Sequence, residues 1–174
     1  MHGLMVWRPA YIGVGSNLDH PQRQVRRALS ALAELPGTRL VCRSPLYGSE
    51  PLGGLKQPRY VNAVAGLLTQ LEPGAFFDAV RLLERELGRV RGDEHWAPRI
   101  IDLDLLVFAR VQQDSAELRL PHPGIVQRNF VLYPLRDVAP GLYVPGCGRV
   151  AWLAERVDPS GIWRLGDEAA THGA

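Results

Sequence analysis

The sequence predicts one α+β domain over residues 1–174, in which helices pack on an antiparallel sheet. The chain is long enough for a single hydrophobic core, and its 46% hydrophobic and 22% charged residues are typical of a globular protein. Short β-type runs alternate with two amphipathic helical patterns. The resulting order, strand–helix–strand–strand–helix–strand, is that of a ferredoxin-like layout with the helices on one face of the sheet.

The first half of this pattern ends at residue 47. Residues 10–18 (AYIGVGSNL) are typical of a strand that breaks at its Gly-Ser-Asn end. Pro21 then opens a helix whose apolar residues keep helical spacing, and Pro36 with the glycine after it ends that helix. Residues 39–47 form the second predicted strand.

The second half contains the longer strands. A loop rich in Gly and Pro (50–58) leads into a strand at 59–71. Pro73 opens a second helix, which carries a buried stripe as far as Gly88. An irregular loop at 89–99 leads into a last strand within 98–108 (PRIIDLDLLVF).

Beyond that strand the pattern weakens. Residues 119–135 contain prolines followed by an apolar run, and the segment after Ala151 is less regular. We expect residues 167–174 to form a loose tail.

Composition argues against several classes of protein. A net charge of +2 gives no support to a nucleic-acid partner. No run approaches the roughly 20 apolar residues of a membrane span, and we recognise no signal peptide. Two cysteines without a CxxC pair are typical of a reduced, cytoplasmic setting.

Two aspartates, Asp102 and Asp104, interrupt the last apolar strand. Side chains alternate along a strand, so both carboxylates lie on one face, with Cα atoms roughly 7 Å apart. A divalent metal would join them, and oxygen ligands without a His or Cys pair suit Mg²⁺ better than Zn²⁺. The alternative is a solvated edge strand whose acids face water or neighbouring arginines.

Three other groups of residues are candidates for binding or catalysis. The loop at 89–99 carries several arginines, which bind phosphate oxygens well but also pair with acids on ordinary surfaces. Tyr60 and Asn62 share one strand face and suit a heteroaromatic ring, or else pack as structural residues. His122 lies between two prolines in a rigid loop, where a structural role is the alternative to a catalytic one.

Taken together, these stretches resemble a known enzyme family. The stretches are IGVGSNL, SEPLGGLKQPRYVNAV, GRVRGDEHWAPRIIDLDLL, LPHP and QRNFVLYPL, which fall in order between about residues 10 and 145. They resemble the 6-hydroxymethyl-7,8-dihydropterin pyrophosphokinases of folate biosynthesis. The resemblance implies a ferredoxin-like αβα sandwich that transfers pyrophosphate from ATP to the pterin hydroxymethyl group and releases AMP.

The same resemblance implies a role for particular residues. Two Mg²⁺ ions would bind Asp102 and Asp104. The catalytic residues would be Arg89, Arg99, Asp102 and Asp104. Contacts to the pterin would come from Ser49, Pro51, Leu52, Gly53, Tyr60, Asn62, Trp96 and Phe130. Contacts to ATP would come from Glu84, Arg91, Arg99, His122 and Arg128.

The implied partners are these two small molecules, with no nucleic acid and no membrane. The family also implies a monomer, and contact with other folate-pathway enzymes is left open. Two other functions are alternatives to this one. An Mg-dependent nucleotide hydrolase would use the same aspartates but gives Asn62 and the aromatic residues no purpose. An RNA-binding sheet would need an aromatic-rich strand that the sequence lacks.

Overall fold

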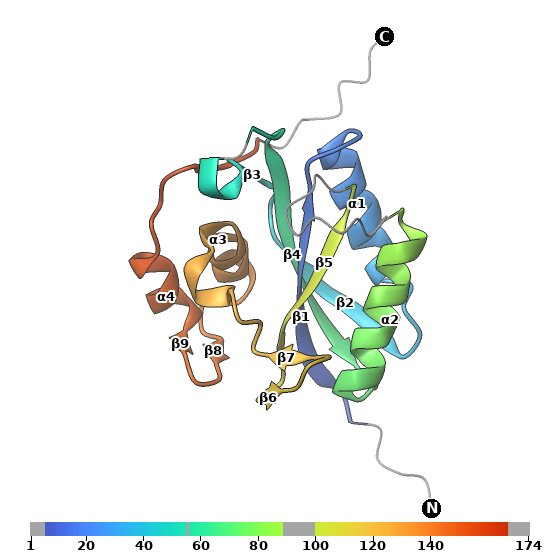
Figure 1. Cartoon of the computed structure of the whole chain (residues 1–174). Coiled ribbons are helices and arrows are strands. Elements are labelled where there is room, and N and C mark those ends of the chain that lie inside the picture. Colours follow the sequence, from blue (N-terminus) through green and yellow to red (C-terminus); the bar gives the residue numbers. More distant parts are fainter. Residues whose placement is uncertain (1–5, 55, 89–99, 167–174) are drawn as a thin grey trace, which may run out of the picture.

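One sheet lies between two layers of helices (Figure 1). The structure is a computed structural model that describes residues 6–54, 56–88 and 100–166. Its helices are α1 (Pro21–Leu32), α2 (Pro73–Glu86), α3 (Asn129–Val138) and α4 (Val150–Arg156). The strands of the main sheet are β1 (Arg8–Ser16), β2 (Thr38–Arg43), β3 (Tyr47–Ser49), β4 (Tyr60–Thr69), β5 (Asp102–Phe108) and β10 (Ile162–Arg164).

The strands follow the order β10–β3–β4–β1–β5, and every pairing is antiparallel. Strand β2 pairs with the same edge of β4 as β3 does, further along that strand. Two small hairpins complete the described strands: β6 (Gln113–Asp114) with β7 (Arg119–Leu120), and β8 (Tyr143–Val144) with β9 (Gly148–Arg149). Short 3₁₀ turns occupy Leu52–Gly54 and Ile125–Gln127.

The predicted α+β class and the αβα sandwich are confirmed, but the first expectation of helices on one face alone is wrong. Helices α1 and α2 cover one face of the sheet, and α3 and α4 cover the other (Figure 1). The sequence pattern did not predict α3, which begins within the apolar run of residues 119–135 and contains Pro134. Proline has no backbone N–H to donate and is unusual in a helix interior.

Alternation along the strands builds a separate core on each face. In β1, Ala10, Ile12 and Val14 are buried against the α1 and α2 side, while Tyr11 packs toward α3 and α4. On that second side the sheet meets fully buried side chains of α3, such as Leu132. Burial of apolar surface on both faces explains why β4 is buried along almost its whole length.

The predicted strand at 39–47 is divided in the structure. Between β2 and β3, Ser44 continues the pairing with β4 in an irregular way. Its backbone N–H donates to the Val64 carbonyl at 2.9 Å, and its hydroxyl accepts from the Val64 N–H at the same distance. Pro45 follows and has no N–H to continue the ladder.

The aspartate-bearing strand also begins later than predicted. Strand β5 opens at Asp102, so the two aspartates lie at its start and not in its middle. The tail predicted at 167–174 lies outside the described residues. Among those that are described, no helix is both long and apolar enough to cross a membrane.

The second helical layer generates a stability prediction. Leu132 of α3 is fully buried, so Leu132→Ala should lower the free energy of unfolding by about 2–5 kcal/mol, since it removes buried methyl groups and leaves a cavity. Leu82→Ala is the matched control, because Leu82 on α2 is 50% exposed and its replacement should change stability by less than about 0.5 kcal/mol. Urea denaturation measures the free energy of unfolding of each variant. If Leu132→Ala lowers it no more than Leu82→Ala does, the packing of α3 against the sheet does not stabilise the fold.

Candidate active site

The two predicted metal ligands share the sheet face that α3 covers further along. In β5, Leu103 and Leu105 point to the α1 and α2 side, where they are buried. Asp102 and Asp104 therefore project from the opposite face, and the Asp104 side chain keeps 34% of its surface exposed. The two carboxylates are next to one another and reachable by a ligand.

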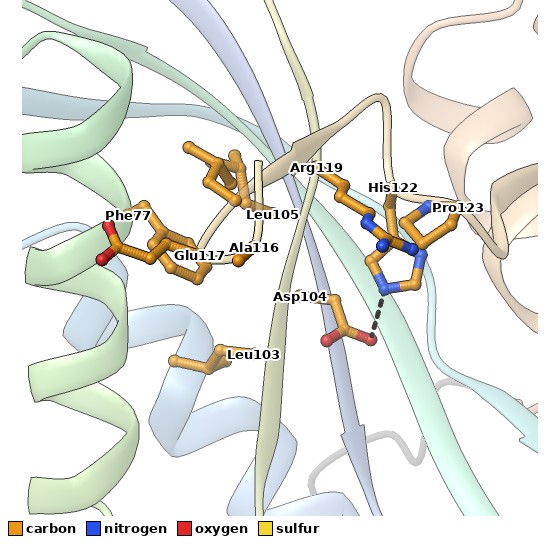
Figure 2. A pocket seen from close by; sticks show the side chains of 10 residues that line it. Phe77, Leu103, Asp104, Leu105, Ala116, Glu117, Arg119, His122 and Pro123 are labelled. Atoms are coloured by element: carbon orange, nitrogen blue, oxygen red, sulfur yellow. Dashed lines mark ion pairs between the residues drawn. The ribbon is translucent and has the colours of Figure 1, made fainter. Parts of the chain in front are cut away.

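His122 and Arg128 both approach Asp104. His122 follows β7 and lies 3.9 Å from the Asp104 carboxylate through Nε2 (Figure 2). The guanidinium of Arg128, the residue before α3, lies 3.8 Å from the same oxygen. The structure thus brings together three residues that are predicted to contact ATP or metal.

The imidazole of His122 is held in its neutral form. Burial lowers the pKa of His122 to about 4, and the charge of Arg128 acts in the same direction against the weaker opposing effect of Asp102. Its Nδ1 accepts a hydrogen bond from the Gly124 N–H at 3.1 Å, which assigns the ring proton to Nε2. At neutral pH the ring therefore directs an N–H donor, and no net charge, toward Asp104.

Two residues from outside the sheet form hydrogen bonds with the outer edge of β5. This strand ends the sheet order, so its outward backbone groups need partners outside the sheet. Glu84 of α2, which is 2% exposed, accepts the Leu103 N–H at 2.8 Å. The His122 N–H donates to the Leu106 carbonyl, also at 2.8 Å. Glu84 thus supports the strand between the two aspartates, and its contact with ATP stays a prediction.

A second polar group lies across the neighbouring strand. Asn62 of β4 is buried, and its amide donates to the Ser49 hydroxyl of β3 at 2.9 Å. Asn62 pairs with Gly15 of β1, which in turn pairs with Asp102. Strands lie about 4.8 Å apart, so the Cα atoms of Asn62 and Asp102 are separated by about 10 Å.

Gly15 places no side chain on the sheet surface between Asn62 and Asp102. A Cβ at this position would lie 3.4 Å from the Asn62 side-chain oxygen, on the face that carries the polar groups. Glycine therefore leaves space above β1 for a ligand that reaches from Asn62 toward the aspartates.

The remaining predicted pterin residues border Asn62 or α3. Tyr60 is two residues before Asn62 on β4, and its hydroxyl donates to the Gln57 side chain at 3.3 Å. Pro51 precedes the short 3₁₀ turn Leu52–Gly54, in which Leu52 is 42% exposed. Phe130 lies in the first turn of α3, with its ring 5.9 Å from the guanidinium of Arg128.

Four predicted residues lie outside the described part of the chain: Arg89, Arg91, Trp96 and Arg99. Their roles stay predictions.

An open pocket of about 300 Å³ adjoins Asp104 and His122 (Figure 2). The residues that line it are Phe77, Leu103, Asp104, Leu105, Ala116, Glu117, Leu118, Arg119, His122 and Pro123. Most were missed from the sequence, because Phe77 lies on α2 and the stretch from Ala116 to Arg119 belongs to the β6–β7 hairpin. Neither segment carries a motif, and only the fold joins them.

The chain is similar to a known protein family and to several of its members. Residues 11–140 match the model of the 7,8-dihydro-6-hydroxymethylpterin-pyrophosphokinase family. A 2-amino-4-hydroxy-6-hydroxymethyldihydropteridine pyrophosphokinase of Pseudomonas aeruginosa is 47% identical over 155 residues, covering 89% of this chain and 95% of that protein. A Haemophilus influenzae protein of the same name is 42% identical over 147 residues, covering 84% and 91%.

A solved structure shares the fold at much lower sequence similarity. Plasmodium falciparum wild-type HPPK-DHPS superposes with a TM-score of 0.66 at 12% identity, covering 86% of this chain and 44% of that one. The present chain thus spans less than half of that longer protein. On the family match and the identities to the two bacterial proteins, the chain belongs to the 7,8-dihydro-6-hydroxymethylpterin-pyrophosphokinase family.

Proposed function

We propose that this chain transfers the pyrophosphoryl group of ATP to 6-hydroxymethyl-7,8-dihydropterin in folate biosynthesis. The hydroxymethyl oxygen would attack the β-phosphorus, the bond from that phosphorus to the α–β bridging oxygen would break, and AMP would leave. The hydroxyl proton would pass to solvent. The observation that carries the proposal is the row Asn62–Gly15–Asp102, which sets a polar amide and a carboxylate pair about 10 Å apart on one face.

The pterin would lie on the Asn62 side of this row. The amide held by Ser49 offers both a donor and an acceptor to a ring edge. Tyr60 and Phe130 supply flat apolar surfaces for stacking, and the turn at 51–53 supplies backbone groups. A bicyclic ring with a one-carbon arm is comparable in length to the span toward Asp102, so its hydroxyl would reach the carboxylates.

The aspartate pair fits Mg²⁺. Within the described residues no group of three or more His, Cys, Asp or Glu could hold a metal ion. Mg²⁺ suits a pair nonetheless, because it commonly binds one or two carboxylates and fills its other positions with substrate phosphates and water. When bound, two such ions would neutralise phosphate charge and orient the reacting oxygens. We assign Asp102 and Asp104 as their ligands.

The residues around Asp104 would hold the triphosphate. The Nε2–H of neutral His122 and the guanidinium of Arg128 are two donors directed at the same place. We also assign Arg89 and Arg99 to the phosphates, and Arg91 and Trp96 to closure over the substrates. Glu84 would act mainly through the backbone of β5, beside the nucleotide.

The pocket beside Asp104 and His122 would receive the nucleoside of ATP. Phe77, Leu105 and Leu118 give it an apolar side that suits a purine ring. Glu117 and Arg119 give its rim polar groups. The phosphates would then extend from this pocket to the aspartate pair.

We further propose one catalytic domain that works as a monomer in the cytoplasm, where the two free cysteines would stay reduced. Contact with other enzymes of the folate pathway is a separate proposal, for which the wild-type HPPK-DHPS structure is an analogy of fold alone.

The direct test is an ATP assay at saturating Mg²⁺, with and without 6-hydroxymethyl-7,8-dihydropterin, in which AMP and ADP are separated by chromatography. We expect AMP only when the pterin is present, because the β-phosphorus needs the pterin hydroxyl as its acceptor. ADP as the product, or AMP without pterin, would indicate a nucleotide hydrolase instead.

Asp102→Ala and Asp104→Ala should each lower kcat by at least about 10³-fold in this assay, since either loss removes a metal ligand. Asp78→Ala is the control, because Asp78 is an exposed residue of α2, which covers the opposite face of the sheet, and should leave kcat unchanged. Thermal unfolding checks that all three variants fold. A folded and active Asp104→Ala enzyme would contradict the metal assignment.

Tyr60→Ala should raise the Kd for the pterin by about tenfold and leave the Kd for ATP within about twofold, because it removes a stacking surface on the pterin side alone. Calorimetric titration of each substrate measures both constants. Tyr143→Ala, at a residue that is 60% exposed, serves as the control. A larger effect on ATP than on pterin would reverse the two halves of the site.

A further inference from the structure

The last strand of the described residues, β10, connects two parts of the candidate site. Strand β10 adds to the outer edge of β3, with Ile162 opposite Ser49 and Trp163 opposite Gly48. The backbone bonding extends past both ends. The Glu50 N–H donates to the Gly161 carbonyl and the Leu165 N–H donates to the Leu46 carbonyl, each at 2.9 Å. This edge of β3 leads directly into the loop at 50–59, which carries three of the predicted pterin contacts, Pro51, Leu52 and Gly53.

The side chain of Trp163 packs against Gly48 of β3. A Cβ at Gly48 would overlap the Trp163 indole, so the ring rests directly on the glycine backbone. Side chains alternate along β3, so Gly48 faces away from Ser49 and its partner Asn62. Trp163 therefore packs on the sheet face opposite to the proposed pterin site and would not touch a pterin bound there.

Both ends of the loop at 50–59 are joined at this tryptophan. The guanidinium of Arg59 lies 5.2 Å from the Trp163 ring, and its Nε pairs with the Glu50 carboxylate at 3.0 Å. Glu50 opens the loop and Arg59 closes it, just before Tyr60. An exposed ion pair alone contributes little, but here the ring and the backbone bonds of β10 fix both partners.

The other end of the segment is fastened to α3. The side-chain amide of Asn129 donates to the carbonyls of Asp158 and Ser160, each at 2.8 Å. Ser160 in turn donates both its N–H and its hydroxyl to the Asp158 carboxylate, at 2.9 and 2.8 Å. Asn129 lies between Arg128 and Phe130, so this turn is anchored beside the second wall of the site.

We propose that residues 158–165, the C-terminal strap, hold the two walls of the pterin site in place, and that Trp163 is a positioning residue for pterin binding. The inference rests on the proposed function, because it takes the loop at 50–59 and Phe130 as those walls. The loop is rich in Gly and Pro, and Gly53 and Gly54 have positive φ, so without the strap it would lose more conformational freedom on binding.

Trp163→Ala should therefore raise the Kd and KM for the pterin by about tenfold, while kcat at saturating pterin and the Kd for ATP stay within about twofold. Trp152→Ala is a closely matched control. Trp152 is 50% exposed, lies on α4, and has the guanidinium of Arg156 4.4 Å from its ring, whereas Trp163 is 36% exposed with Arg59 at 5.2 Å. We expect the control to keep wild-type pterin binding.

Two more variants separate positioning from general stability. Trp163→Phe keeps an aromatic ring on Gly48 and should recover most of the affinity for pterin. Asn129→Asp replaces both donors without changing the size of the side chain, and should weaken pterin binding from the α3 side. If Trp163→Ala does not fold, Asn129→Asp carries the same comparison between the two substrates.

The outcomes separate this inference from the proposed function. Wild-type protein that neither binds the pterin nor forms AMP would overturn the proposed function itself. Wild-type activity together with pterin constants in Trp163→Ala and Asn129→Asp that equal those of Trp152→Ala would overturn the strap alone. Equal losses of pterin and ATP affinity would also overturn it, because they would indicate a general loss of structure.

Discussion

Burial of the sheet on both faces is the constraint on which the rest of this structure depends. A strand in such a sheet has to be apolar on both sides, as β4 nearly is. In β5 the side chains toward α1 and α2 obey this, whereas Asp102 and Asp104 on the other side do not. Carboxylates are costly to take out of water, and the Asp104 side chain keeps 34% of its surface exposed at this end of the sheet. The opening is where the candidate site lies.

The backbone of β5 is nevertheless supported at this open end by hydrogen bonds from outside the sheet. Glu84 accepts a hydrogen bond from the strand between the two aspartates, and the loop that carries His122 donates to it further along. The same loop delivers the neutral imidazole to Asp104. Strand support and site chemistry therefore come from the same segments, which keeps the carboxylate pair in a fixed geometry for a ligand.

The polar groups of the two halves are related by strand register. One row across β4, β1 and β5 joins Asn62 to Asp102 through Gly15, and a shift of one residue in either pairing would turn these side chains to opposite faces. The apolar residues of β1 prevent such a shift, since it would bring Ile12 and Val14 out of their core. The hydrophobic core thus fixes the spacing between the proposed pterin and metal groups.

The sequence by itself determined the central strands, both helices of the first layer and the aspartate pair on one strand face, because alternation and helical spacing are local properties of the chain. It also carried the motifs of the family. Only the tertiary structure decided that α3 covers the second face in spite of Pro134, and that Phe77 and the β6–β7 hairpin meet beside Asp104. Only the tertiary structure also shows that Trp163 lies against Gly48, a residue 115 positions earlier in the sequence. Such contacts join segments far apart in the chain, and no local pattern records which distant segment will lie alongside.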